Sequence, residues 1–151
     1  MDFAAYITGF ADGEGSFSIS FNSRSKLRTG IEIRPSFAIA QNASSLKSLE
    51  QIRDYFKCGS IRYSIKDNTY KYEVRSITDL TQVIIPHFIK YPLQTAKSND
   101  FNTFRIICEM IANKDHQQVD NLDNIIDLAI TMNPSGKRKY TKDKLLQFVT
   151  R

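Results

Sequence analysis

The sequence lacks several features that would assign it to a common class of enzyme or scaffold. It has two cysteines, Cys58 and Cys108, and two histidines, His87 and His116, in 151 residues. The histidines do not have the spacing of a zinc site or of a histidine-based nuclease, and there is no CxxC pair, phosphate-binding glycine loop or Ser-His-Asp pattern. The cysteines lie in apolar segments of helical character, which predicts reduced, buried thiols and no disulfide framework. We expect each histidine to be structural or exposed.

Long apolar runs are also missing. No stretch approaches the roughly 18 consecutive apolar residues that a membrane-spanning helix needs. The first residues, Met-Asp-Phe, do not form the basic segment that begins a secretory signal. We therefore expect a soluble, unsecreted protein with no membrane partner. A length of 151 residues with 41% hydrophobic residues fits one domain, residues 1–151, with a core of its own.

Charge is unevenly distributed along the chain. The net charge is +5, and residues 16–30 and 134–151 are strongly basic. Residues 109–127 instead carry five acids against one lysine. One basic and one acidic face would suit a polyanionic partner, although many ordinary soluble proteins are equally basic.

The spacing of apolar residues predicts an α+β protein with the order helix, two strands, helix, two strands, helices. The first helix covers residues 3–12, with Asp2 as its candidate N-cap, and two alternating strands follow as an antiparallel ribbon that turns near Gly30. The second helix covers residues 44–57, with Asn42 or Ser44 as its cap and Gly59 at its end.

The second half of the chain continues this pattern. Residues 61–66 and 71–75 alternate as two further strands around a turn at Asp67 and Asn68, and the rest reads as helices broken at prolines. These prolines are Pro86, Pro92 and Pro134. No internal repeat is visible.

All four predicted strands place aromatic or branched apolar residues on one face, which helices can cover, and polar residues on the other. Many of the polar residues are of types that hydrogen-bond base edges, and a two-stranded ribbon can enter the major groove. The alternative is an ordinary sheet with one solvated face. The candidate DNA contacts, with Arg28 in the turn, are Ser18, Ser20, Asn22, Arg24, Lys26, Arg28, Glu32, Arg34, Ser36, Arg62, Ser64, Lys66, Lys71, Glu73 and Arg75.

The run from Tyr6 to Gly15 stands directly before the first strand. It combines the small residue Gly9, the acid Asp12 and the ending Gly13-Glu14-Gly15. This run resembles the signature of the LAGLIDADG homing endonucleases, and the order of helices and strands behind it fits as well. The resemblance implies the αββαββα homing endonuclease fold, with a four-stranded antiparallel DNA-binding sheet and C-terminal helices. Taken alone, ten small and apolar residues would more often be a plain core helix.

Small residues on a helix allow two backbones to approach closely, so Gly9, with Ala5 one turn earlier, can form a seam between two copies of this helix. Ile7 and Phe10 would then point into each subunit's own core. The motif occurs once in the 151 residues. The resemblance therefore implies a homodimer on a twofold DNA site, with Ala5, Thr8, Gly9 and Asp12 in the dimer interface.

The resemblance also implies catalytic roles. Glu14, with the carbonyl of Gly13, would hold the metal: Mg²⁺, with Mn²⁺ as a substitute and Ca²⁺ binding without supporting cleavage. Gln41 stands where a polar residue contacts the water network, and Lys97 where a catalytic lysine is usual. The alternatives are backbone capping for Gln41 and a solvated helix-start lysine for Lys97.

Two departures from the family pattern and one basic loop complete the resemblance. Glu14 replaces the commoner aspartate, and Ser45 stands where some relatives place an arginine. The loop with Lys137, Arg138 and Lys139 resembles one that grips the DNA backbone, a contact that adds affinity but little sequence choice.

The leading interpretation is a site-specific homing endonuclease that makes metal-dependent double-strand cuts in a long, palindromic or near-palindromic DNA site. One alternative is the same scaffold acting without cleavage, as a DNA-binding protein or as a maturase bound to its host-intron RNA. Another is an unrelated α+β domain with a chance motif, which would be a monomer. An intracellular location follows from the resemblance, but an organelle (chloroplast or mitochondrion) and a prokaryotic cytoplasm stay open.

Overall fold

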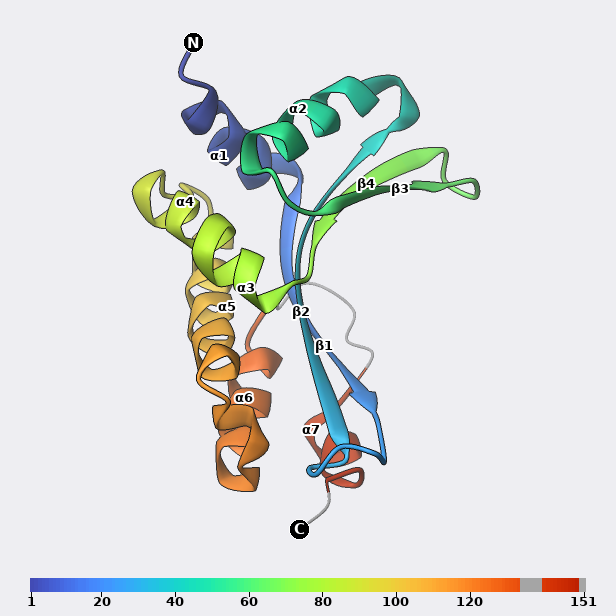
Figure 1. Cartoon of the computed structure of the whole chain (residues 1–151), viewed down its shortest axis with the longest axis vertical. Coiled ribbons are helices and arrows are strands. Elements are labelled where there is room, and N and C mark those ends of the chain that lie inside the picture. Colours follow the sequence, from blue (N-terminus) through green and yellow to red (C-terminus); the bar gives the residue numbers. More distant parts are fainter. Residues whose placement is uncertain (134–139, 150–151) are drawn as a thin grey trace. The chain divides into compact units, whose positions relative to one another are not determined.

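A computed structural model describes residues 1–133 and 140–149 of the chain. The elements follow the predicted order of helix, two strands, helix, two strands and helices, which confirms the α+β class (Figure 1). Four strands form one sheet in the order β1-β2-β4-β3, and β4 runs antiparallel to both of its neighbours. The chain divides into two compact units, Met1–Phe17 with Ser36–Ser98 and Ser18–Pro35 with Asn99–Arg151. A single domain over residues 1–151 stays a prediction.

The first helix, α1 (Phe3–Glu14), begins as predicted and ends later. The Asp2 side chain accepts a hydrogen bond from the Ala5 amide at 3.3 Å, as an N-cap does. The helix then continues two residues past the predicted end at residue 12, through Gly13 and Glu14. Glycine lowers helix propensity by about 1 kcal/mol without forbidding the helix, and the amide of Gly15 closes the last turn on the carbonyl of Ala11. This extension makes Glu14 the last residue of α1.

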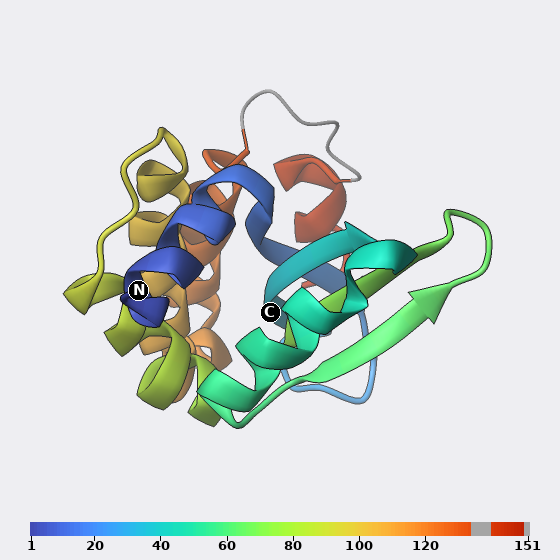
Figure 2. The same ribbon diagram turned by 90° about the horizontal axis from the view of Figure 1, so that it is seen from above.

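The core of the first unit joins α1, α2 (Leu46–Phe56), α4 (Ile85–Lys90) and the paired parts of the sheet. Figure 2 shows α2 lying along β4 (Thr69–Val74) and β3 (Ser60–Ser64). Three phenylalanines meet at its centre, with ring centroids 5.0 Å apart for Phe17 and Phe37 and 5.4 Å apart for Phe37 and Phe88. The other fully buried side chains of this core include Ile7, Ile39, Leu49, Ile52 and Tyr72.

The prediction that the apolar residues of the third strand are buried is wrong beyond the first of them. Tyr63 is 48% exposed and Ile65 is 85% exposed, although their spacing suggested burial. The reason is that β3 is the edge strand, and its hairpin with β4 extends past α2 (Figure 2). Alternation on an edge strand therefore does not imply a covering helix.

The start of α2 clarifies which residue caps it. Asn42 accepts hydrogen bonds from the amide of Ser44 at 3.0 Å and from its hydroxyl at 2.9 Å, ahead of a 3₁₀ turn at Ala43–Ser45. Lys57, with a φ of 58°, ends the helix, two residues earlier than the predicted Gly59. Gly59 serves a close approach instead, because a Cβ there would lie 2.7 Å from the Tyr72 ring.

Pro86 does not break the helical segment, which corrects the prediction made for it. The chain runs from α3 (Ile77–Asp79) through a π-helical turn (Leu80–Ile84) directly into α4, with Pro86 in the first turn of α4. A proline ring clashes with the carbonyl four residues earlier in an α-helix, and the wider π turn accommodates that ring. Pro92 does follow the end of a helix. Pro134 lies outside the described residues.

The second unit contains the outer parts of β1 (Gly15–Ser23) and β2 (Ile31–Asn42), most of α5 (Lys97–Ala112), and the helices α6 (Val119–Ile130) and α7 (Lys142–Leu146). Ile31, Leu122, Ile126 and Leu145 form its buried cluster. Tyr140 packs edge-on against Phe21 at 4.9 Å and donates a hydrogen bond to the carbonyl of Ile19 at 3.0 Å.

Within residues 1–133 and 140–149, no helix has the length and apolarity that crossing a membrane requires. Cys58 and Cys108 are free thiols; Cys108 is buried, as predicted, whereas Cys58 is only half-buried.

Candidate functional site

The outward face of α1 carries only small side chains at its centre. Ala5, Gly9 and Gly13 are exposed and lie four residues apart, so they form one stripe along the helix. In the described part of the chain, a Cβ atom added at Gly9 or at Gly13 would meet nothing within 4 Å. Ile7 is fully buried on the opposite face, as predicted, and Phe10 is half-buried. The stripe is therefore open to a partner.

Thr8 lies on the inward side of the same helix. It is 6% exposed, donates its hydroxyl proton to the carbonyl of Tyr91 at 2.8 Å, and accepts from Nε2 of His87 at 3.2 Å. His87 is itself buried among aromatic rings, and loss of hydration there lowers its pKa to about 4. Thr8 thus anchors α1 to α4 within one chain, while Ala5 and Gly9 form the outward stripe.

Asp12, near the end of α1, binds the loop that precedes α5. Its Oδ2 accepts from the amide of Gln94 at 2.9 Å, and its Oδ1 accepts from the amide of Thr95 at 3.1 Å and from the hydroxyl of Thr95 at 2.8 Å. Burial raises the pKa of Asp12, but these hydrogen bonds and the charge of Lys97 outweigh burial, so the pKa lies below its usual value. The carboxylate therefore holds a loop about eighty residues away in sequence.

Lys97 is brought to the end of α1 by this loop. Its Nζ donates to the carbonyl of Ala11 at 2.9 Å, and its amide donates to the Thr95 hydroxyl at 3.3 Å. The carbonyl end of a helix carries partial negative charge, which favours a cation there. The alternative of a solvated helix-start lysine does not describe this half-buried, hydrogen-bonded side chain.

Glu14 and Gly13, the predicted metal ligands, are both exposed at the end of α1. An acid at a helix C-terminus is unfavourable for the helix itself, because it adds negative charge to the negative end of the helix dipole. The same arrangement offers hard oxygen donors to a cation, the donor type that Mg²⁺ prefers. Across the described part of the chain, no group of three or more His, Cys, Asp or Glu side chains could hold a metal. One chain therefore supplies only part of a coordination shell, and Mg²⁺ commonly completes it with water and substrate phosphates.

Gln41 lies near the end of β2, opposite Tyr70 of β4. It is half-buried, and its side-chain amide donates to the carbonyl of Ala40 at 2.8 Å. The alternative role considered for Gln41, capping the next helix, is performed by Asn42. Ser45, which stands where some relatives place an arginine, is half-buried before α2 and makes no side-chain cap.

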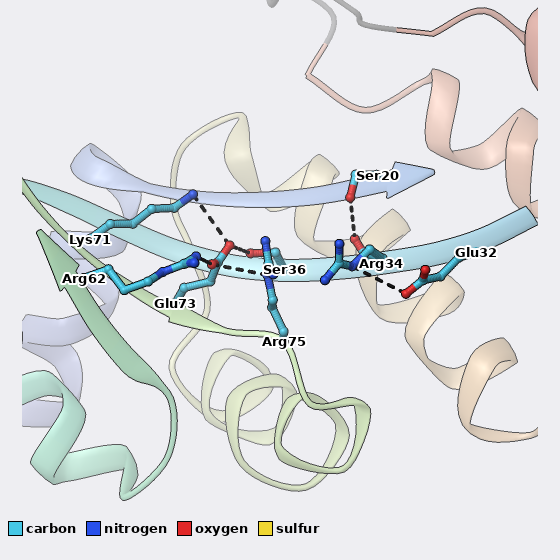
Figure 3. Close-up of polar contacts among 8 residues, drawn as sticks. All are labelled: Ser20, Glu32, Arg34, Ser36, Arg62, Lys71, Glu73 and Arg75. Atoms are coloured by element: carbon cyan, nitrogen blue, oxygen red, sulfur yellow. Dashed lines mark hydrogen bonds and ion pairs between the residues drawn. The ribbon is translucent and has the colours of Figure 1, made fainter. Parts of the chain in front are cut away.

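The polar face of the first unit's sheet is organised around Glu73 (Figure 3). Its Oε1 accepts from Arg62 at 2.6 Å and lies 3.2 Å from Nε of Arg75. Its Oε2 accepts from the hydroxyl of Ser36 at 2.6 Å and lies 3.6 Å from Nζ of Lys71. Glu73 is 6% exposed and Ser36 8% exposed, whereas the three cations are about half exposed. Five of the predicted contacts thus meet in one cluster, and two of them, Ser36 and Glu73, are buried in it.

The polar face of the second unit's sheet is more open. Glu32 lies 3.3 Å from Arg24 and 3.6 Å from Arg34, and the Ser20 hydroxyl donates to the carbonyl of Arg34 at 3.2 Å (Figure 3). Of the other predicted contacts, Asn22, Lys26, Arg28 and Lys66 are exposed, and Ser18 and Ser64 are half-buried. Lys137, Arg138 and Lys139 lie outside the described residues.

Sequence reasoning missed three contacts of this site: Asp12 with the loop at 94–95, Thr8 with His87, and Ser36 with Glu73. Each joins residues at least 37 positions apart, so no local pattern could reveal it. A weak signal existed for Glu73, which is the only acid in a strand that is otherwise flanked by Lys71 and Arg75.

Comparison with known proteins agrees with this geometry. The sequence profile of the LAGLIDADG endonuclease family matches residues 7–108. The chain is 33% identical over 132 residues to "Probable intron-encoded endonuclease 2" of Neurospora crassa, covering 85% of this chain and 29% of that protein. It spans less than a third of the length of this and the next two curated relatives.

Solved structures agree at the level of the fold. The structure of a homing endonuclease, I-TnaI, superposes with a TM-score of 0.84 at 29% identity, covering 96% of this chain and 94% of that chain. The LAGLIDADG homing endonuclease I-SmaMI bound to cleaved DNA superposes with a TM-score of 0.88 at 31% identity, covering 97% of this chain and 48% of that chain.

The chain has a small-residue helix that ends in an acid, followed by two strand pairs separated by a helix. This arrangement and the solved neighbours place the chain in the class of homing endonuclease folds, as predicted from the sequence. Within that class, the chain belongs to the LAGLIDADG endonuclease family.

Proposed function

We propose that this chain is a magnesium-dependent, site-specific DNA endonuclease that cuts both strands of a palindromic or near-palindromic site as a homodimer. The observation that carries the proposal is the exposed Glu14 at the carbonyl end of α1, beside the small-residue stripe of Ala5, Gly9 and Gly13. An acid at this end of a helix is unfavourable for the helix dipole, so its position is better explained by binding of a cation. The homing endonuclease fold and the cleaved DNA bound in the solved I-SmaMI neighbour support a DNA substrate.

The small-residue stripe supports pairing with a second copy of this chain. Two helices that meet at glycine and alanine approach more closely than helices that carry large side chains. In a twofold pair, the two α1 ends and their Glu14 carboxylates lie together, which supplies the second carboxylate that one chain lacks. A twofold protein also matches a twofold DNA site.

Mg²⁺ bound at Glu14 and at the Gly13 carbonyl would polarise the scissile phosphate and lower the pKa of a bound water. The neighbouring residues of this chain position the loop before α5 and stabilise charge on the phosphate. Asp12 holds the loop at 94–95, which places Lys97 at the end of α1, and the ammonium there can stabilise negative charge that develops on the phosphate. Gln41 offers an amide that can orient a water molecule.

The central experiment is the substitution Glu14→Gln. Sites cleaved by the wild-type protein in Mg²⁺ are first selected from a randomised palindromic DNA library. The variant is expected to bind the selected site as the wild type does and to lose cleavage by more than about a thousandfold, because its amide is a poor metal ligand. Glu109→Gln removes the same charge from an exposed surface pair with Arg105 and serves as the control. Undiminished cleavage by Glu14→Gln would refute the role of Glu14.

The dimer is tested by sedimentation with the substitution Gly9→Leu. Among residues 1–133 and 140–149, nothing lies within 4 Å of a Cβ at Gly9, so the monomer is expected to fold. A leucine at the seam would force the two helices apart, so the variant is expected to sediment as a monomer at concentrations where the wild type is a dimer. A monomeric wild-type protein on its DNA site would contradict the homodimer.

A further inference from the structure

Both carboxylate oxygens of Glu73 are engaged within the chain. Oε1 accepts a hydrogen bond from Arg62 at 2.6 Å and lies 3.2 Å from Nε of Arg75. Oε2 accepts a hydrogen bond from the hydroxyl of Ser36 at 2.6 Å and lies 3.6 Å from Nζ of Lys71. Because these partners surround the carboxylate and its side chain is only 5% exposed, Glu73 is poorly placed to accept from a cytosine amino group, the contact that its residue type suggested.

Glu73 is buried although it does not belong to the apolar core. It alternates with Tyr72 and Val74, which face the core, so its side chain lies on the opposite face of β4. The register places Ala38 of β2 and Ser60 of β3 beside it, and neither side chain is large enough to cover it. The long side chains of Arg62, Lys71 and Arg75 cover it instead (Figure 3).

The charge of Glu73 is maintained in this position. Burial raises its pKa, but the Ser36 hydrogen bond and the three cations outweigh burial, so the pKa lies below its usual value. At neutral pH one carboxylate thus holds three cations, and the cluster keeps a surplus of positive charge. The cations remain 61%, 49% and 48% exposed for Arg62, Lys71 and Arg75.

We propose that Glu73 is a positioning residue for DNA specificity, which fixes Arg62, Lys71 and Arg75 so that they address base edges and are restrained from moving to phosphates. The proposal rests on the DNA-binding function proposed above. Arginine discriminates guanine only when its planar donors are held in register with the base, whereas any mobile cation can neutralise a phosphate. A buried anion that is bonded to each cation supplies that restraint before DNA arrives.

A second acid on the sheet shows the contrast. Glu32 contacts Arg24 and Arg34 at 3.3 and 3.6 Å, but its own side chain is 29% exposed, against 5% for Glu73. Exposed pairs of this kind are weak and exchange readily with water. Glu32 is therefore available to DNA, and Glu73 is not.

The test compares wild type, Glu73→Gln and the matched charge control Glu109→Gln in two measurements. The first is the base preference at each position of sites enriched by binding from a randomised palindromic library in Ca²⁺. The second is the salt dependence of binding to one enriched site. For Glu73→Gln we expect base preference to fall about tenfold at a few positions. The slope of log affinity against log salt should steepen by about one, because a released cation neutralises a further phosphate. Glu109→Gln should change neither the preferences nor that slope by a comparable amount.

Two further variants keep the proposal testable if Glu73→Gln does not fold. Ser36→Ala removes one hydrogen bond and keeps every charge, so it should weaken base preference at the same positions without the change in slope. Glu73→Asp keeps the charge and should restore the wild-type slope. Circular dichroism and thermal melts establish that each variant is folded.

Unchanged base preferences and an unchanged slope in folded Glu73→Gln would overturn the proposal. So would a uniform loss of affinity for all sites with preferences intact, since that is the result of a purely structural ion pair. If the wild-type protein enriches no DNA site at all, the proposed function fails, and this inference fails with it.

Discussion

The end of α1 and the polar face of the sheet each contain an acid that is bonded within the chain, next to charged side chains that are exposed. At the end of α1, Asp12 accepts three hydrogen bonds within the chain, while Glu14, two residues later, is left exposed. On the sheet, Glu73 is engaged by Ser36 and three cations, and those cations are about half exposed. In both regions an acid that is bonded within the chain builds the scaffold. The difference lies in what the scaffold presents, which is an exposed anion, the proposed metal ligand, in the first region and exposed cations, the proposed DNA contacts, in the second.

The largest expected effect concerns Lys97, which the scaffold at the end of α1 holds in place. Lys97→Met keeps the aliphatic stem and removes the ammonium. Cleavage of the selected DNA site should slow by about 10²–10³-fold, as removal of one charge-stabilising donor does, with little change in affinity for that site. Single-turnover cleavage and gel-shift titration measure the two quantities. Arg105→Met, which removes a surface cation paired with Glu109, is the control. Equal losses of cleavage and binding would show that Lys97 acts mainly as a DNA contact.

The second prediction compares the two acids of the sheet by their effect on stability. Glu73→Gln should lower the free energy of unfolding by about 3 kcal/mol, because it removes the charge that holds three clustered cations together and weakens the hydrogen bond from the buried Ser36 hydroxyl. Glu32→Gln should lower it by less than about 1 kcal/mol, as an exposed pair does. Urea denaturation of the two variants and the wild type measures this. Similar losses of stability in both variants would mean that Glu73 is no more structural than Glu32.

The third prediction makes the same comparison at the end of α1. Asp12→Asn should cost about 2 kcal/mol, because an amide replaces a carboxylate that accepts three hydrogen bonds. Glu14→Gln should leave stability unchanged or raise it by about 0.5 kcal/mol, since it removes an acid from a helix C-terminus. Thermal unfolding of both variants and the wild type in the absence of metal measures these changes in stability. A stability loss in Glu14→Gln as large as in Asp12→Asn would mean that Glu14 is structural.

The smallest effect concerns the inward face of α1, where Thr8 contacts His87. Burial depresses the pKa of His87 to about 4, below the usual value of 6.5. Below pH 6.5 the unfolded chain binds a proton that the folded chain excludes, so stability is complete above that pH and is lost as pH falls toward 4. Between pH 6.5 and 5 this loss amounts to about 1.5 kcal/mol.

His87→Phe keeps an aromatic ring and removes the titrating group, so the dependence of its stability on pH should be shallower in that window. Urea melts at several pH values compare the two proteins. His116 also has a lowered pKa and is present in both, so it cancels in the difference. Identical pH dependence in wild type and variant would contradict the assignment to His87.

Local patterns predicted most of the elements because each depends on neighbouring residues. Alternation of Phe17, Ile19 and Phe21 predicted β1, and helical spacing with an Asp2 cap predicted α1. The failures occurred where the tertiary environment decided. Ile65 follows the alternation of β3 and is nevertheless exposed, because the hairpin of β3 and β4 extends past α2. Pro86 sits inside a helical segment because a π turn accommodates it.

The sequence by itself determined the class of fold and the family, because a helix with small residues and a terminal acid before an alternating strand is a local arrangement. Tertiary structure alone decided which acids are available. Asp12 and Glu73 have the same charge as Glu14 and Glu32, but partners distant in the sequence hydrogen-bond to them: residues 94–95 to Asp12 and Ser36 to Glu73. Hydrogen bonding depends on proximity in space, and the chain brings these groups together only when it folds.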